Sequence, residues 1–212
     1  RAFMNGKILR NNLSGKCDSI HFSQLTGIAQ LINKQNSFNE RSRKIKKPIL
    51  WSNKSQITGD SIHIKFDTEK NIIDSLFVFD NAFIIEKDTL EIGFNQISGK
   101  ILNGNFIDGK LKEVDIIKNA ESVYYLRNSE NELIGIDKSK SAKIKILISE
   151  QNVNTFTKIN QIDGNVYPED EFNENDKLLK GFFFREDEII KTIDDLFIED
   201  KKFQFTKIKK LE

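Results

Sequence analysis

The sequence predicts an all-β protein, an antiparallel roll of repeated hairpins with one or two short helices near the C-terminus. Three observations carry this prediction. The 212 residues include 31 Ile and 17 Phe but only 5 Ala, a balance that suits pleated strands better than helices. Apolar and polar residues alternate over many short runs. Two sequence motifs recur about 40 residues apart, which is typical of stacked structural repeats.

The predicted strands follow one another along the chain with short turns between them. Every second residue is apolar in 62–66, 113–116 and 143–148, the period of a strand with one buried and one solvated face. Turn signals rich in Asp, Asn, Gly and Ser separate runs of about 5 to 9 residues and indicate a meander of hairpins. These signals lie at 67–71, 80–81, 108–109, 128–131 and 150–152.

Helical patterns are confined to the last fifth of the chain. We predict short helices at 174–179 and 189–197, the second with Thr192 as a capping residue before Asp194 and Asp195. Both helices follow the repeated strands, so we expect them in a C-terminal extension.

Internal repetition predicts the domain organisation. The tetrapeptide Asp-Ser-Ile-His occurs at 18–21 and again at 60–63, and Ser-Gln-Ile-Thr-Gly at 55–59 recurs as Asn-Gln-Ile-Ser-Gly at 95–99. One such unit cannot bury its own apolar face, so the units are expected to stack around a shared interior. We predict a roll over 1–165, with units near 14–54, 55–94, 95–138 and 139–165, a basic loop inserted at 33–47, and an extension at 166–212 that packs on or caps the roll.

Charge and cysteine usage exclude several classes of protein. The chain has 33 Lys and Arg against 32 Asp and Glu, so the basic excess of a general nucleic-acid binder is missing. No run of apolar residues is long enough to span a membrane. The single Cys17 excludes an internal disulfide, and we interpret it as a small buried hydrophobe. Residues 1–6 carry no apolar signal core, and we interpret the chain as a processed protein or a piece of a longer one.

No pattern of catalytic or metal-binding residues stands out. The sequence lacks a glycine-rich phosphate loop, a Gly-x-Ser-x-Gly motif and a His-Glu-x-x-His motif. The acids at 186–188 and 194–195 are neighbours in polar runs, whereas a carbohydrate-active enzyme needs two carboxylates across one cleft. His21 and His63 belong to the repeated tetrapeptide, and we interpret them as surface or hydrogen-bonded histidines. We therefore predict no enzyme, no cofactor and no metal site.

Several short motifs, in this order and spacing, resemble the OstA-like family, relatives of the LptA-type lipopolysaccharide-transport proteins, in a version with a long C-terminal extension. The resemblance spans most of the chain. The motifs are Cys-Asp-Ser-Ile at 17–20, Pro-Ile-Leu-Trp at 48–51 leading into 55–60, Asn-Ala-Phe at 81–83, Gly-Phe-Asn-Gln-Ile at 93–97, 119–121 with Val-Tyr-Tyr at 123–125, Leu-Ile-Gly-Ile at 133–136, Tyr-Pro-Glu at 167–169, and Gly181-Phe182 before Arg185.

The resemblance implies a twisted β-jellyroll in the periplasm that binds lipopolysaccharide or a related glycolipid and helps to move it to the outer membrane. It also implies that such rolls join end to end through edge strands, with other proteins of this fold or with copies of themselves. No nucleic acid partner and no catalytic residue are expected. The alternative from the residues alone is a β-solenoid scaffold that assembles through its edge strands and binds no lipid.

Two groups of residues are the candidates for ligand contact. The first group consists of apolar strand positions, which the residues alone would assign to an ordinary hydrophobic core. The resemblance implies that they line the interior and contact acyl chains. They are Ile62, Ile64, Phe66, Leu76, Val78, Phe83, Ile85, Val114, Ile116, Val123, Tyr125, Ile144, Ile146 and Ile148. Basic residues of the inserted loop are candidates for the phosphates of the headgroup, or else form a solvated loop: Arg41, Arg43, Lys44, Lys46 and Lys47.

Overall fold

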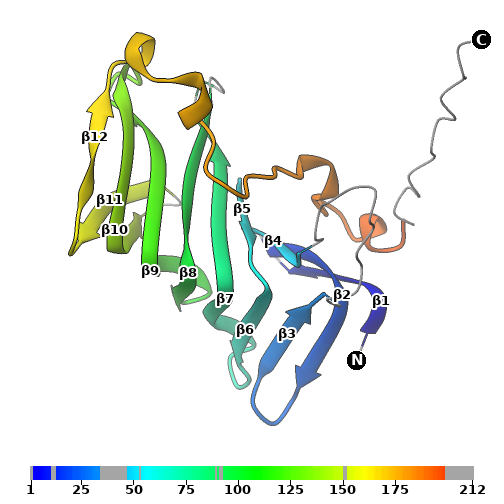
Figure 1. Cartoon of the computed structure of the whole chain (residues 1–212). Coiled ribbons are helices and arrows are strands. Elements are labelled where there is room, and N and C mark those ends of the chain that lie inside the picture. The colour runs from blue at the N-terminus through cyan, green and yellow to red at the C-terminus, as the bar shows by residue number, and fades with distance from the viewer. Residues whose placement is uncertain are drawn as a thin grey trace, which may run out of the picture.

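The computed structural model describes residues 2–10, 13–33, 47–52, 54–88, 90, 93–149 and 152–198. Within these residues, twelve strands form one antiparallel sheet, and four single-turn 3-10 helices follow (Figure 1). The predicted all-β class is confirmed. The strands are β1 (Ala2–Arg10), β2 (Leu13–Ser23), β3 (Ile28–Ile32), β4 (Ile49–Ser52), β5 (Ser55–Thr58), β6 (Ser61–Asp67), β7 (Ile72–Lys87), β8 (Phe94–Ile107), β9 (Lys110–Arg127), β10 (Leu133–Ser149), β11 (Asn152–Ile159) and β12 (Asp163–Tyr167).

A single bend crosses the sheet and divides the long strands into two segments. On β7 it lies at Asp80 and Asn81, with φ of 55° and 51°, and on β9 at Lys118 and Asn119, with φ of 66° and 52°. The pairing register skips at the same places, from 79 to 82 between β7 and β8 and from 98 to 101 between β8 and β9. Asn and Asp adopt this left-handed conformation more readily than other L residues, so the sequence favours a bend at Asp80, Asn81 and Asn119.

The prediction of a chain-reversing turn at 80–81 is therefore wrong. Because β7 continues through this pair of residues, β7 to β10 have 16, 14, 18 and 17 residues and are longer than the predicted runs. The turns predicted at 67–71, 108–109 and 128–131 do connect strands. Asp108 and Gly109 both have positive φ, as a two-residue type I′ hairpin requires. The turn predicted at 150–152 falls mostly outside the described residues.

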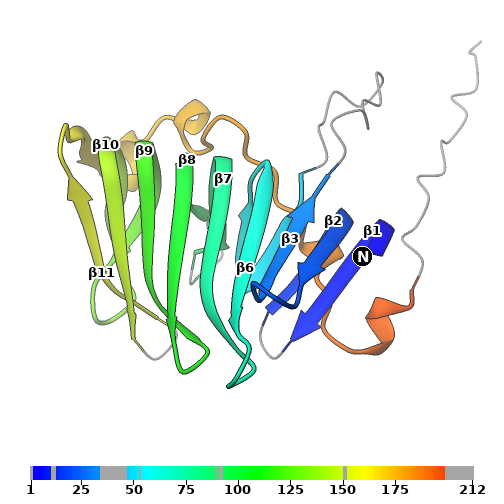
Figure 2. The same cartoon turned by 90° about the horizontal axis from the view of Figure 1, so that it is seen from below.

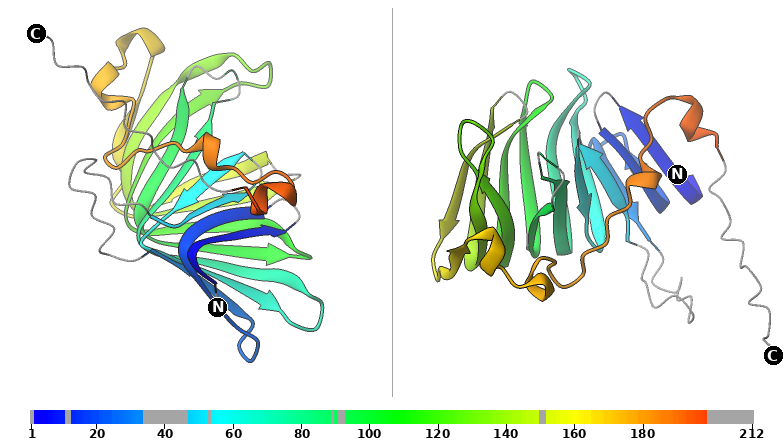
Figure 3. Two further views of the ribbon diagram at one scale, coloured as in Figure 1. Left: turned by 90° about the vertical axis from the view of Figure 1, so that its right-hand side faces the viewer. Right: turned by 90° about the horizontal axis from the view of Figure 1, so that it is seen from above.

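The bend creates two leaves, which diverge from it in the end-on view (Figure 3, left). Leaf A contains β3, β6, β11 and the segments 72–79, 101–107, 110–117 and 143–149 of the long strands; Figure 2 shows it from below. Leaf B contains β4, β5, β12 and the segments 82–87, 94–99, 120–127 and 133–141. Both leaves end at β2 and β1, because β2 pairs with β3 in leaf A and with β4 in leaf B.

The residues after β12 form an extension with little regular structure. Its helices are single 3-10 turns, η1 (Glu169–Glu171), η2 (Glu174–Asp176), η3 (Glu186–Glu188) and η4 (Asp194–Leu196). The two longer helices predicted at 174–179 and 189–197 are wrong: each shrinks to one turn, since no buried residue lies within η2 or η4 to give a helix an apolar face. The extension passes from η1 beside β10 to η4 beside β1 (Figure 1).

β12 reaches two residues past the predicted boundary at 165. It pairs with β10 from Lys140–Asp163 to Ile136–Tyr167, so its last residues belong to the sheet. No helix in the described part of the chain is long and apolar enough to cross a membrane.

Candidate functional site

One continuous cluster of apolar side chains fills the space between the leaves. Ten of the predicted inner-face residues lie on the face of leaf A that contacts this cluster. Eight of these are buried, namely Ile62, Ile64, Leu76, Val78, Val114, Ile116, Ile144 and Ile146, and two are half-buried, Phe66 and Ile148.

The remaining four predicted residues lie on the opposite face, contrary to the expectation. Phe83, Ile85, Val123 and Tyr125 belong to a second cluster on the outer face of leaf B. The physical reason is the bend: two residues are inserted, so the alternation of faces keeps its phase. Positions 82 and 84 of β7 therefore continue the inner face begun by 76 and 78, and Phe83 and Ile85 turn outward.

Leaf B contributes inner-face residues that sequence reasoning missed. They are smaller on average than those of leaf A and include Leu50, Ile57, Ala82, Ile97 and Ala120. The sequence did contain a signal for them: every second residue faces inward on both sides of the bend, as 76, 78, 82 and 84 do on β7. Leu31 and Leu102 were also missed, and both are completely buried in the interior.

The two free margins of the roll, opposite the bend, differ in character. Along leaf A, half-buried apolar side chains near the hairpin ends pack against the interior cluster, including Phe66, Phe106 and Ile148. Along leaf B the margin is held by polar contacts, chiefly the buried ion pair between Arg127 and Asp88. An apolar rim along one margin gives an apolar ligand a first contact with the interior.

The interior becomes polar at its β10 end. The Asp137 carboxylate, on the inner face of leaf B, accepts hydrogen bonds from the hydroxyls of Ser139 at 3.0 Å and Ser122 at 3.4 Å. Lys158 of β11 donates to the same carboxylate at 2.6 Å. A buried charge with three donors is well compensated, so this group closes the apolar cluster without a free charge inside the roll.

Two glutamines of the duplicated motif tie the extension to the outer face of leaf B. The Gln56 side chain accepts from the backbone N–H of Arg185 at 2.7 Å and donates to the carbonyl of Phe183 at 2.8 Å. Gln96 repeats this pattern, accepting from Leu179 and donating to Lys177. Both glutamines are completely buried. Each side-chain amide therefore pairs with the extension as a neighbouring strand would, and the extension crosses the strands instead of following them.

Apolar contacts complete the docking of the extension. Phe172 and Leu179 are buried against the outward residues of leaf B, with Phe182 and Phe184 beside them. Trp51 lies in the same layer. Its ring packs edge-to-face against that of Phe184, with the ring centroids 5.5 Å apart. Its fluorescence therefore reports on the extension rather than on the interior.

Replacing both Gln56 and Gln96 with alanine should release the extension. Each substitution removes the acceptor of a buried backbone N–H, that of Arg185 or that of Leu179, at about 1–3 kcal/mol for each group. We expect a red shift of Trp51 emission and faster proteolysis within 168–198, with the far-ultraviolet spectrum of the sheet retained. Gln30→Ala is the matched control, because Gln30 lies on β3, away from the extension. An unchanged emission and cleavage pattern in the double variant would contradict this role of the glutamines.

The cysteine and the two histidines discussed in the sequence analysis take structural roles. Cys17 is buried in the interior cluster, as expected, and burial raises the pKa of its thiol to about 11. The two repeated histidines do not meet, because β3 lies between them and Gln30 is the cross-strand neighbour of both. His63 packs against the ring of Phe79, and burial lowers its pKa.

Of the basic headgroup candidates, only Lys47 lies within the described residues. Its ammonium group forms an ion pair with Asp60 at 2.9 Å. Its carbonyl accepts a hydrogen bond from the guanidinium of Arg185, so the end of the inserted loop is attached to the extension. The other candidates, Arg41, Arg43, Lys44 and Lys46, lie outside the described residues.

No protein-family model and no curated protein sequence matches the chain. Among solved structures, the fold is similar to that of LptH from Pseudomonas aeruginosa, described as the LptA-homologous periplasmic component of the conserved lipopolysaccharide transport device. The TM-score is 0.50 at 14% sequence identity, over 74% of this chain and 95% of LptH. At this identity the likeness establishes the fold: the chain is an LptA-like β-jellyroll.

Proposed function

We propose that the chain is a non-enzymatic carrier or bridge that holds the acyl chains of lipopolysaccharide, or of a related glycolipid, between its two leaves. The observation that carries this proposal is the continuous apolar interior with an apolar rim along the margin of leaf A. The similarity of the fold to a periplasmic component of a lipopolysaccharide transport device supports the ligand class and a periplasmic location.

Binding in the interior requires the leaves to part. Leu31, Ile62 and Val78 are 0% exposed, so their side chains already fill the space that an acyl chain would occupy. Each methylene of an acyl chain transferred from water contributes about 0.8 kcal/mol, so several chains offset the contacts that are lost when the leaves separate. The apolar rim of leaf A is where the first methylenes would enter.

We infer that the edge strands serve for assembly, with a second copy or with another protein of this fold. Among the described residues, β11 and β12 pair only with β10, and β1 pairs only with β2, so each end of the sheet offers a strand edge to another chain. β12 is the more accessible edge, since 163–166 are exposed. Added strands gain main-chain hydrogen bonds at such edges.

Photo-crosslinking to lipopolysaccharide tests the interior site. A benzoylphenylalanine replaces Phe106 at the rim or, as the matched control, Phe79 on the outer face of leaf A. Delipidated protein is titrated with lipopolysaccharide below the concentration at which the lipid aggregates. We expect saturable binding, with crosslinks from position 106 and not from 79. Binding without crosslinks at 106, or equal crosslinks at both positions, would contradict an interior site.

A second function, a scaffold that assembles through edge strands and binds no lipid, is favoured by the close packing of the interior. One cluster joins both leaves, and many of its members have no exposed surface. The same titration separates the two: a folded protein that binds no lipopolysaccharide but forms concentration-dependent oligomers in sedimentation velocity is a scaffold.

A further inference from the structure

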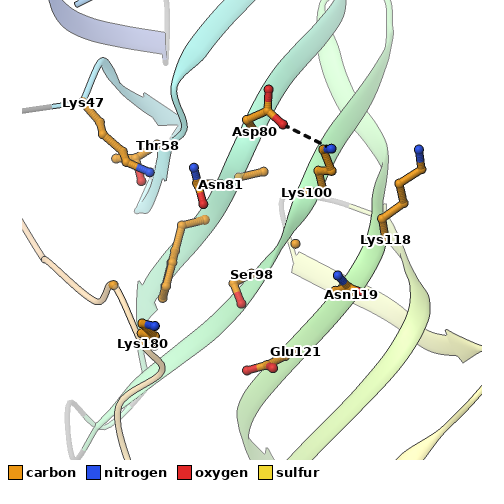
Figure 4. A pocket seen from close by; sticks show the side chains of 14 residues that line it. Lys47, Thr58, Asp80, Asn81, Ser98, Lys100, Lys118, Asn119, Glu121 and Lys180 are labelled. Atoms are coloured by element: carbon orange, nitrogen blue, oxygen red, sulfur yellow. Dashed lines mark ion pairs between the residues drawn. The ribbon is translucent and has the colours of Figure 1, made fainter. Parts of the chain in front are cut away.

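A pocket of about 480 Å³ lies on the outer face, at the bend, between the long strands and the extension (Figure 4). It is separate from the interior, because its floor includes Phe83 and Ser98, which lie on the outer face of leaf B. Its far wall is Lys180 and Gly181 of the extension. Docking of the extension therefore completes the pocket.

Four lysines surround this pocket: Lys47, Lys100, Lys118 and Lys180 (Figure 4). They come from four segments that are distant in sequence. Lys118 stands in the bend of β9, where its left-handed conformation places it beside the bend of β8. Among the described residues, neither Lys118 nor Lys180 forms an ion pair. Two cations are thus free to meet an anion at this place.

The two acids of the pocket do not cancel this charge. Asp80 has a loose contact with Lys100, at 3.8 Å, and Glu121 is paired at 3.2 Å with Lys140, outside the pocket lining. Lys47 pairs with Asp60. Counted with these partners, five lysines face three carboxylates, which leaves a local charge of +2 in a chain whose net charge is +1.

Neutral donors complete the lining. Thr58 and Ser98 are equivalent positions of the duplicated motif, and both are cross-strand neighbours of Phe83. The amides of Asn81 and Asn119 come from the two left-handed bends. The motif therefore has two outward positions with separate uses: its glutamines hold the extension and its hydroxyls line the pocket.

We propose that this pocket binds a phosphate group, carried by a phosphorylated sugar or a similar phosphomonoester. Ammonium, hydroxyl and amide donors around one open pocket match the several acceptor oxygens and the negative charge of phosphate. The open shape admits a phosphate at the end of a larger molecule. The site goes beyond the proposed function, because it opens on the outer face of the roll and its charged and hydrogen-bonding side chains do not belong to the interior cluster.

Amide chemical shifts test the proposal directly. Labelled protein is titrated with inorganic phosphate and with glucose 1-phosphate at constant ionic strength, with sodium chloride as the reference salt, and the amides of Gly99 and Gly181 report on the pocket. We expect saturable shifts with both phosphates and none with chloride. The variant Lys118→Ala/Lys180→Ala should bind at least fivefold more weakly. Lys110→Ala is the matched control, since it lies on the same strand at the far hairpin.

Two results would overturn the phosphate site: chloride produces the same shifts as phosphate, or the double variant binds as tightly as the unchanged protein. Co-sedimentation with vesicles of phosphatidylcholine, with or without phosphatidic acid, identifies the source of the phosphate. Capture by phosphatidic acid that is lost in the double variant assigns the site to a lipid headgroup, and binding of glucose 1-phosphate alone assigns it to a soluble sugar phosphate. The double variant should still crosslink lipopolysaccharide at position 106, so this test and that of the interior fail independently.

Discussion

Replacing Val78 with aspartate should abolish cooperative folding of the roll. Val78 is completely buried in the middle of leaf A, and its neighbours in the interior are apolar. A carboxylate there loses its hydration without gaining a partner, at a cost of several kcal/mol, and the valine contributes a further 1.5–3 kcal/mol or so that is lost. The sum approaches the whole stability of an ordinary domain, about 5–15 kcal/mol.

Urea unfolding followed by circular dichroism measures this effect. The matched control is Phe79→Asp. Phe79 is the next residue of β7, and its side chain points outward and is 37% exposed. We expect the control to keep a cooperative transition and Val78→Asp to lose it. Ile146→Asp should repeat the result from β10. A wild-type midpoint for Val78→Asp would mean that this face of leaf A does not point into the core.

The strand faces of leaf A were predictable from the sequence because they depend on local alternation alone. Leaf B was harder, because the signal at Asp80 and Asn81 is the same for a turn and for a bend. Both need left-handed backbone at Asn or Asp. Only the pairing with β8 on both sides of these residues shows that the strand bends and continues instead of reversing. The bend recurs 38 residues later at Lys118 and Asn119, where Asn119 is the one residue of the pair whose type favours left-handed backbone.

The extension and the outer pocket were beyond sequence reasoning for a different reason. Both depend on contacts between residues that are far apart, such as Gln56 with Arg185, 129 positions later. The duplicated motif could be seen in the sequence, but its role in docking the extension could not. Glutamine in a strand is usually solvent-exposed, so the burial of these two side chains was not predictable. Burial of both glutamines follows from the extension, which has no periodicity of its own. The motif therefore marks the sheet positions that receive the extension.

In the proposed opening of the interior we expect leaf A to move, because the ion pair between Arg127 and Asp88 clamps the margin of leaf B. Arg127 of β9 donates through Nε and Nη2 to the two oxygens of Asp88, directly after β7, so the pair links two strands that β8 separates. These hydrogen bonds raise the pKa of the guanidinium. The ends of leaf A have half-buried apolar side chains in the corresponding places, and no hydrogen bond or ion pair of the described residues would have to break there for the proposed ligand to enter.

Arg127→Met should accordingly destabilise the protein by about 3–5 kcal/mol, because it removes the guanidinium that pairs with the buried Asp88 carboxylate, whose side chain is 1% exposed. Guanidinium chloride unfolding measures the loss of stability.

The control is Lys145→Met, which removes the ion pair between Lys145 and Glu113 on the solvated face of leaf A. This pair is similar in length, but its removal should change stability little. Adding Asp88→Asn to Arg127→Met removes the buried charge and should restore much of the loss. If the single variant were as stable as the control, the margin of leaf B would not be clamped, and both leaves would be equally free to open.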